Sequence, residues 1–73
     1  MEQQVLQLLE SEYPDIDFRS GAALVDDGIL DSLTITGIVA ALSLTFDVTI
    51  PYEEITEENF NSVTAMAAMI ERL

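Results

Sequence analysis

The sequence has no cysteine, no histidine and no lysine. Cysteine supplies disulfides and thiolate metal ligands, so without it the fold must rest on a hydrophobic core alone. Without histidine, cysteine or lysine, most general-base, activated-nucleophile and zinc chemistry lacks its usual side chains. We therefore expect neither an enzyme nor a metal site.

Positive charge is nearly absent as well. The chain has 14 acidic residues but only two cations, Arg19 and Arg72, and its formal net charge at pH 7 is −12. A surface of this sign repels nucleic-acid phosphates and anionic lipids. We expect no nucleic-acid partner, and we expect partner proteins to offer a basic contact patch.

Long apolar runs are missing too. None approaches the roughly 20 residues of a membrane span, and residues 1–4 lack the basic start of a signal peptide. Yet 49% of the residues are hydrophobic, which argues for a folded core in spite of the charge. A chain of 73 residues allows one domain, residues 1–73, with little room for an enclosed active site. We expect this domain to be cytoplasmic, without membrane insertion, and monomeric.

Apolar residues at helical spacing predict three main helices. The first covers residues 2–12 and ends before Pro14, because the residue before a proline avoids the helical conformation. The second has the strongest pattern and covers residues 32–46, and the third follows a cap at Asn61 or Ser62. The core stripe of the second helix is predicted to consist of Ile35, Ile38, Val39, Leu42 and Phe46.

The segments between these helices lack a period. Residues 15–31 contain scattered apolar side chains, which predicts a long loop pinned to the core, with one helical turn near Ala22 to Val25. Residues 48–51 are extended, but no second strand exists to pair with them, so we interpret them as a connector. Residues 56–60 predict a short helix with acidic side chains near its positive end. The predicted fold is all-α: a four-helix bundle of three main helices and a short one, with a long loop between helices 1 and 2.

A second row of side chains runs along the helix 32–46, next to the core stripe. Its members are uncharged and either small or apolar: Leu33, Thr36, Gly37, Ala40 and Leu44. Glycine in a helix interior costs about 1 kcal/mol relative to alanine, and nothing in the local sequence offsets this cost. Two interpretations stay open. The row packs under the long loop, or it is a docking face whose small side chains let a partner approach closely.

An acidic turn with a serine near its end, residues 26–33 (DDGILDSL), leads into this helix. It does not fit a calcium loop, because the EF-hand pattern needs glycine at its sixth position and glutamate at its twelfth, and frames set on Gly21 and Gly28 both miss it. Ser32 allows two interpretations. Asp31 or Ser32 can simply cap the helix. Alternatively, the Ser32 hydroxyl is a covalent attachment point, with unpaired helix N–H groups beside it that favour a phosphate.

Residues 26–33 resemble the attachment motif of the acyl and peptidyl carrier proteins, and the resemblance covers nearly the whole chain. Further landmarks of that family coincide with Ile50-Pro51, Phe60, Ser62-Val63 and the closing helix. The resemblance implies that a phosphopantetheinyl transferase attaches 4'-phosphopantetheine, taken from coenzyme A, to Ser32. The arm would supply the thiol that the chain lacks and would hold an acyl or aminoacyl group as a thioester.

The resemblance also implies roles for the neighbours of Ser32. Asp31 and Leu33 help the transferase to recognise the site, and the helix 32–46 is the docking surface. The predicted partner contacts on that helix are Leu33, Thr36, Gly37, Ala40 and Leu44. Carriers of fatty acid synthesis usually line this helix with acids, whereas residues 33–46 contain none. In this respect the chain is more similar to discrete carriers of the peptidyl and D-alanyl types.

We therefore predict a stand-alone, non-catalytic carrier. It would be loaded by an adenylating acyl or aminoacyl ligase and would serve downstream enzymes that transfer the acyl or aminoacyl group. The alternative is a small helical interaction module that uses the same face and carries no prosthetic group. The two differ in whether Ser32 is modified.

Overall fold

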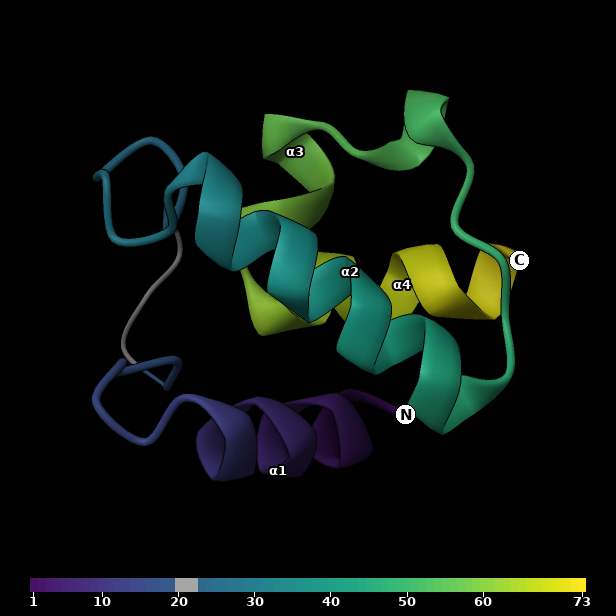
Figure 1. Cartoon of the computed structure of the whole chain (residues 1–73), viewed down its shortest axis with the longest axis horizontal. Helices are drawn as coiled ribbons and strands as arrows, with labels where there is room; N and C mark the ends of the chain where they lie inside the picture. The colour runs from purple at the N-terminus through teal and green to yellow at the C-terminus, as the bar shows by residue number, and fades with distance from the viewer. Residues whose placement is uncertain (20–22) are drawn as a thin grey trace.

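The computed structural model describes residues 1–19 and 23–73. These residues form α1 (Glu2–Glu12), α2 (Ser32–Phe46), the 3-10 turn η1 (Tyr52–Glu54), α3 (Glu57–Phe60) and α4 (Val63–Arg72), as Figure 1 shows. In that view α2 crosses in front of α4, α1 lies below them and α3 above. The prediction of an all-α bundle, with three main helices, a short one and a long loop between the first two, is confirmed.

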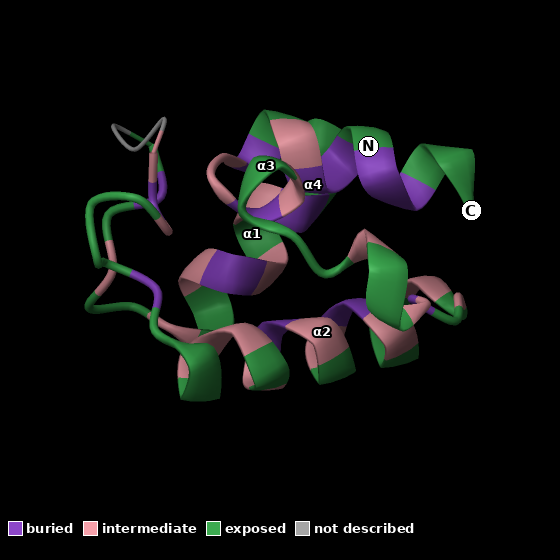
Figure 2. Ribbon diagram, turned by 90° about the horizontal axis from the view of Figure 1, so that it is seen from above, coloured by how far each residue is buried: buried purple, intermediate pink, exposed green. Residues whose placement is uncertain are grey.

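The core lies where the apolar faces of α1, α2 and α4 meet (Figure 2). α1 contributes Val5 and Leu9, and α2 contributes Ile38 and Leu42, all fully buried. The other predicted members of the α2 core stripe are half-buried and pack at the edge of the core: Ile35, Val39 and Phe46. The buried side chains of α4 are Val63, Met66, Ala67, Met69 and Ile70. The core stripe predicted for α2 from its apolar spacing therefore faces the core.

Side-chain caps define where the later helices begin. Asp31 precedes α2 and accepts the backbone N–H of Thr34 at 2.8 Å. Ser62 precedes α4 and accepts the N–H of Ala65 at 3.0 Å. Of the two predicted cap residues, Asn61 and Ser62, it is therefore Ser62 that caps the helix. α2 ends at Asp47, whose left-handed backbone (φ 52°, ψ 50°) stops the helix. Asp tolerates this conformation better than most residues with a side chain.

The loop before α2 is anchored by two buried leucines, Leu24 and Leu30. The carbonyl of Leu24 accepts the N–H groups of Ile29 (2.9 Å) and Leu30 (3.0 Å), and this closes the turn. Gly28 supplies the positive φ (76°) that the turn requires. Of the helical turn predicted near Ala22 to Val25, the first residue lies outside the described residues. The described part contains one helix-like bond, from Asp27 N–H to the carbonyl of residue 23, at 2.8 Å.

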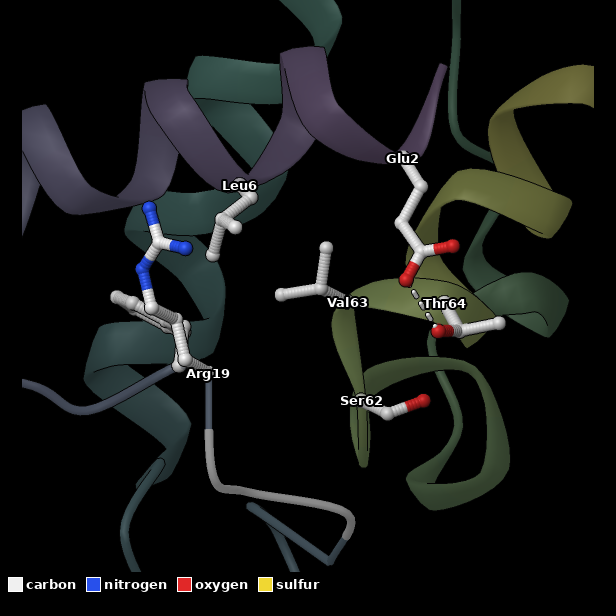
Figure 3. Close-up of a pocket in the computed structure, with 7 residues that line it drawn as sticks. Glu2, Leu6, Arg19, Ser62, Val63 and Thr64 are labelled. Atoms are coloured by element: carbon white, nitrogen blue, oxygen red, sulfur yellow. Dashed lines mark hydrogen bonds between the residues drawn. The ribbon is translucent and has the colours of Figure 1, made fainter.

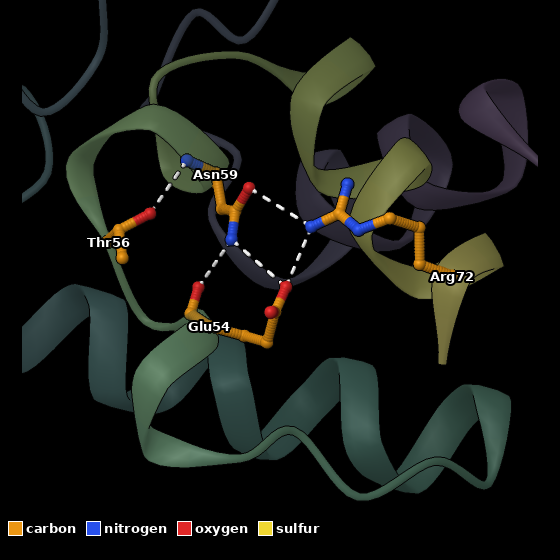
Figure 4. Close-up of polar contacts among 4 residues, drawn as sticks. All are labelled: Glu54, Thr56, Asn59 and Arg72. Carbon is orange, nitrogen blue, oxygen red and sulfur yellow. Dashed lines mark hydrogen bonds and ion pairs between the residues drawn. The ribbon is translucent and has the colours of Figure 1, made fainter.

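The connector after α2 is extended and then forms η1, which the sequence analysis did not predict. Figure 4 shows the polar contacts that tie η1 to α3 and α4. The Oε1 atom of Glu54 accepts hydrogen bonds from Arg72 (2.7 Å) and from the side-chain amide of Asn59 (3.3 Å). The same amide donates to the backbone carbonyl of Glu54 at 2.7 Å, and Arg72 donates to Oδ1 of Asn59 at 3.4 Å. These contacts fix α3 against the end of α4.

Within residues 1–19 and 23–73 the longest helix has 15 residues, and no helix there has the length and apolar character of a bilayer-spanning segment. Across residues 1–19 and 23–73, no three His, Cys, Asp or Glu side chains come together as a metal site would require.

Candidate functional site

Ser32 is the first residue of α2 and is exposed at the end of the loop. The cap of the helix is the side chain of Asp31, so the fold does not use the Ser32 hydroxyl for capping. The backbone carbonyl of Ser32 accepts the Thr36 hydroxyl at 2.9 Å, but its own hydroxyl has no hydrogen-bond partner among the described residues. The hydroxyl is therefore open to solvent and to chemistry performed by another protein.

Asp31 presents a carboxylate beside this hydroxyl. The hydrogen bond from the Thr34 backbone N–H lowers the pKa of Asp31, because the donor stabilises the charged form. Asp31 is therefore ionised at neutral pH and is held in one position by its capping role. A fixed negative charge next to an unpartnered hydroxyl is a feature that a modifying enzyme can recognise.

A groove begins at Ser32, and we call it the Ser32 groove. It lies between the start of α2 and the segment that joins η1 to α3, and its volume is about 280 Å³. Its lining residues are Val25, Ser32, Ile35, Thr36, Ile55, Thr56 and Glu57. Three of these side chains are aliphatic and three carry hydroxyls, so the groove is suited to a chain with both apolar and polar groups rather than to an ion.

An acidic pair lies beside the groove. Glu57 and Asp26 interact through their side chains, and this hydrogen bond together with the charge of Asp26 raises the pKa of Glu57. The pair connects the loop before α2 to α3. It shows that these two segments, which are far apart in the sequence, approach each other closely at one end of the groove.

The row predicted as partner contact does not lie on one surface. Leu33 and Leu44 are 82% and 84% exposed, and Thr36 and Ala40 are exposed between them. Spacings of three, four and four residues align these side chains on one face. We call Leu33, Thr36, Ala40 and Leu44 the exposed stripe. Figure 2 shows the exposed side of α2 facing away from the core.

Gly37 is the exception. It is half-buried, and a Cβ built on it would overlap with the hydroxyl oxygen of Tyr13. Its missing side chain therefore makes room for a residue at the end of α1. For Gly37 the structure favours packing over docking, although the packing partner is Tyr13 and not the long loop. The contact with Tyr13 explains the missing side chain of Gly37 without a partner, and the docking role of Gly37 stays a prediction.

The comparisons with known proteins bear on what the site does. No family model matches the chain, and no solved structure matches it significantly. A D-alanyl carrier protein of Streptococcus pyogenes is 28% identical over 74 residues, which cover 100% of this chain and 94% of the relative. A D-alanyl carrier protein of Lactobacillus delbrueckii is 26% identical over 74 residues, which cover 100% and 92%. Aminoacyl carrier protein 1 of Bradyrhizobium diazoefficiens is 38% identical over 63 residues, which cover 86% and 69%.

The chain belongs to the carrier protein family. The relatives' names describe carriers, and none names a catalytic activity, in agreement with the expectation that this carrier protein is not an enzyme. The names do not say which residue carries the cargo. The roles assigned to Ser32, Asp31 and the exposed stripe stay predictions.

A second hollow of about 240 Å³ lies between α1 and the start of α4 in this carrier protein (Figure 3). The Glu2 carboxylate at its edge already accepts the Thr64 hydroxyl at 2.6 Å, and Arg19 is paired with Glu10 at 2.7 Å. Leu6 and Val63 form the apolar part of its lining. Ser32 is not among its lining residues, and the side chains of Glu2, Arg19 and Ser62 are already bonded within the fold, so we interpret the hollow as a packing feature.

Sequence reasoning missed the site residues that come from distant segments. Val25, Ile55 and Thr56 line the Ser32 groove, and Asn61 holds the loop that leads to it. Asn61 was noticed only as a possible helix cap. No local pattern in the sequence indicates which loop such a side chain contacts.

Proposed function

We propose that this carrier protein holds an acyl or aminoacyl group as a thioester on a 4'-phosphopantetheine arm attached to Ser32. The observation that carries the proposal is the division of roles at the start of α2. Asp31 caps the helix, and the exposed Ser32 hydroxyl is left without a partner in the described chain. A hydroxyl needed only for capping would have been engaged by the backbone.

The residues around Ser32 fit such an arm. The first turn of a long helix favours an anion by roughly 0.3–1 kcal/mol, which suits a phosphodiester at this position. The Ser32 groove offers Ile35 and Ile55 to an apolar stretch, and Thr56 and Glu57 to polar groups. When bound, the arm supplies the thiol that the chain itself lacks. In attachment the Ser32 hydroxyl would give its proton to a base of the transferase, and its oxygen would bond to the phosphorus that carries the pantetheine arm. The P–O bond within the diphosphate of coenzyme A would break, and the nucleotide would leave with the remaining phosphates.

Partner recognition is assigned to Asp31 and to the exposed stripe, which begins with Leu33. Asp31 and Leu33 flank Ser32 and are exposed to a phosphopantetheinyl transferase. The exposed stripe gives the transferase, the ligase and downstream enzymes an uncharged contact, and the acids around it favour a basic rim on those partners. Because the relatives are named for D-alanyl and aminoacyl carriage, we assign the loading step to an adenylating ligase that supplies an amino acid. The carrier would work in the cytoplasm as a monomer.

Intact-mass spectrometry tests the attachment directly. After incubation with coenzyme A and a phosphopantetheinyl transferase, the protein should gain about 340 Da, the mass of the cofactor arm. Ser32→Ala should gain nothing. Ser11→Ala is a matched control, because Ser11 is exposed like Ser32 but lies on α1, and it should gain the full mass.

Two outcomes would contradict the proposal: no gain by the unmodified sequence, or a gain that survives Ser32→Ala. The alternative function, an interaction module without a prosthetic group, then becomes the better account of the exposed stripe. That module predicts partner binding that is the same for the unmodified protein and for Ser32→Ala.

A further inference from the structure

Asn61 lies at the junction between α3 and α4, and its side chain contacts the loop before α2. Its Oδ1 atom accepts the backbone N–H groups of Val25 at 2.9 Å and Asp26 at 3.1 Å. Its Nδ2 atom donates to Oδ2 of Asp26 at 3.2 Å. The backbone carbonyl of Asn61 also accepts the N–H of Leu24 at 2.8 Å. One residue therefore makes four hydrogen bonds to three consecutive residues of the loop.

These bonds continue toward Ser32. The carbonyl of Leu24 accepts the N–H groups of Ile29 and Leu30, and Leu30 is followed by the capping residue Asp31. A continuous path of hydrogen bonds thus runs from Asn61 through Leu24 to the residue two positions before Ser32. The side chains of Leu24 and Leu30 are buried, so the path is also packed against the core.

We infer that Asn61 is a positioning residue for the modification of Ser32. Asn61 acts by holding the loop before α2 in the shape that presents the Ser32 hydroxyl. The inference rests on the proposed function, because it concerns how a phosphopantetheinyl transferase finds its substrate. Asn61 is half-buried and does not line the Ser32 groove. Its effect must therefore pass through residues 24–30, and it should change recognition more than the chemical step.

The experiment measures transferase kinetics on the apo protein, with coenzyme A as the donor. For Asn61→Ala, the KM for the carrier should rise roughly three- to tenfold, the effect of losing about one net hydrogen bond that shapes the recognised surface. The kcat should stay within about twofold, because the reacting hydroxyl is unchanged. Amide exchange at Val25 and Asp26 should accelerate in the same variant.

Asn59→Ala is the matched control. Asn59 also makes three side-chain hydrogen bonds, but to Glu54 and Arg72 (Figure 4), away from the loop. This variant should lose stability as Asn61→Ala does and yet keep the KM of the unmodified sequence. If both variants raise KM equally, a general loosening of the fold is responsible and the inference is overturned. It is also overturned if Asn61→Ala keeps the original KM.

A rescue variant separates positioning from mere folding. Asn61→Asp alone sets a second carboxylate against Asp26, so its KM should rise as in Asn61→Ala. Combining Asn61→Asp with Asp26→Asn exchanges the donor and acceptor roles and allows all three side-chain bonds to form again. The KM of the double variant should return to within about twofold of the original, since the lost hydrogen bonds are regained. A double variant no better than Asn61→Asp overturns the inference, and this comparison decides the question if Asn61→Ala does not fold.

The two proposals fail differently. If the unmodified sequence never gains the arm, the proposed function is wrong. If it gains the arm and the Asn61 variants are loaded with unchanged kinetics, only the role of Asn61 is wrong.

Discussion

The contact between Tyr13 and Gly37 gives the sharpest prediction about the fold, because it decides which side of α2 belongs to the protein itself. A Cβ on Gly37 would overlap with the Tyr13 hydroxyl oxygen, whereas the next atom of that ring, Cζ, would lie 3.6 Å away. A distance of 3.6 Å is ordinary van der Waals contact, so the conflict is confined to a single oxygen. That hydroxyl has no hydrogen-bond partner in the described chain, and removing it should cost little.

The expected change in the free energy of unfolding depends on the helix propensity of residue 37 and on the overlap of its Cβ with the Tyr13 hydroxyl. Replacing glycine by alanine in a helix interior stabilises by about 1 kcal/mol when the site has room. In the Tyr13→Phe background the room exists, so Gly37→Ala should realise most of this gain. With Tyr13 in place the ring must shift, and the gain should shrink or change sign. We expect a coupling free energy of at least about 0.5 kcal/mol between the two positions.

Urea denaturation followed by circular dichroism measures the four free energies of unfolding in this double-mutant cycle. In a thermal scan, 1 kcal/mol corresponds to about 4–8 °C for a domain of this size. Tyr52→Phe is the control, because Tyr52 is 87% exposed and should not couple to Gly37. If Gly37→Ala has the same effect with Tyr13 and with phenylalanine at that position, the two residues do not touch. Gly37 would then return to the set of partner-contact candidates.

Three further predictions concern the surface. Leu44→Glu should change the free energy of unfolding by no more than about 0.5 kcal/mol but lower the rate of loading by the ligase roughly fivefold or more. Leu42 is buried, so Leu42→Ala should lower the free energy of unfolding by about 2–5 kcal/mol. The pKa of Asp31 is lowered in the folded state, so the ionised carboxylate stabilises the fold above its ordinary pKa of 3.8, and this stabilisation is lost as the pH falls through the folded value. Urea denaturation at a series of pH values should show this loss of stability for the original sequence and not for Asp31→Asn. The raised pKa of Glu57 beside Asp26 has the opposite sign and destabilises the fold as the pH rises above the ordinary value of 4.5. Glu57→Gln should therefore raise stability at pH 7 more than at pH 4, and an equal effect at both would contradict the pairing.

The helices could be predicted from the sequence because their signals are local. Apolar spacing gave the bounds of α1 and α2 and the buried positions of α2, since a helix face is set by its own residues. The cap of α4 was narrowed to Asn61 or Ser62 for the same reason. A cap acts within one turn, so its residue type and position are visible in the chain.

The contacts around the candidate site could not be predicted, because they join residues far apart in the chain. Asn61 and Val25 are 36 positions apart, and Tyr13 meets Gly37 across two helices. A glycine in a helix indicates that another group packs closely against that position, but it does not identify the group. The sequence therefore identifies Ser32 as the candidate site. The groove beside Ser32 and the contacts of Asn61 with the loop become visible only in the structure.

The distribution of charge on α2 supports a docking role for its exposed stripe. The chain has 14 acidic residues, yet none lies between Ser32 and Phe46. Leu33 and Leu44 are more than 80% exposed, so they contribute little to the core. In a strongly acidic protein, charged side chains at these positions would favour solubility and would not disturb the fold. We therefore propose that this uncharged stripe, which starts beside Ser32 and continues along α2, is explained by a partner surface outside the chain. That surface would cover the stripe during the proposed modification of Ser32 and the transfer of its cargo.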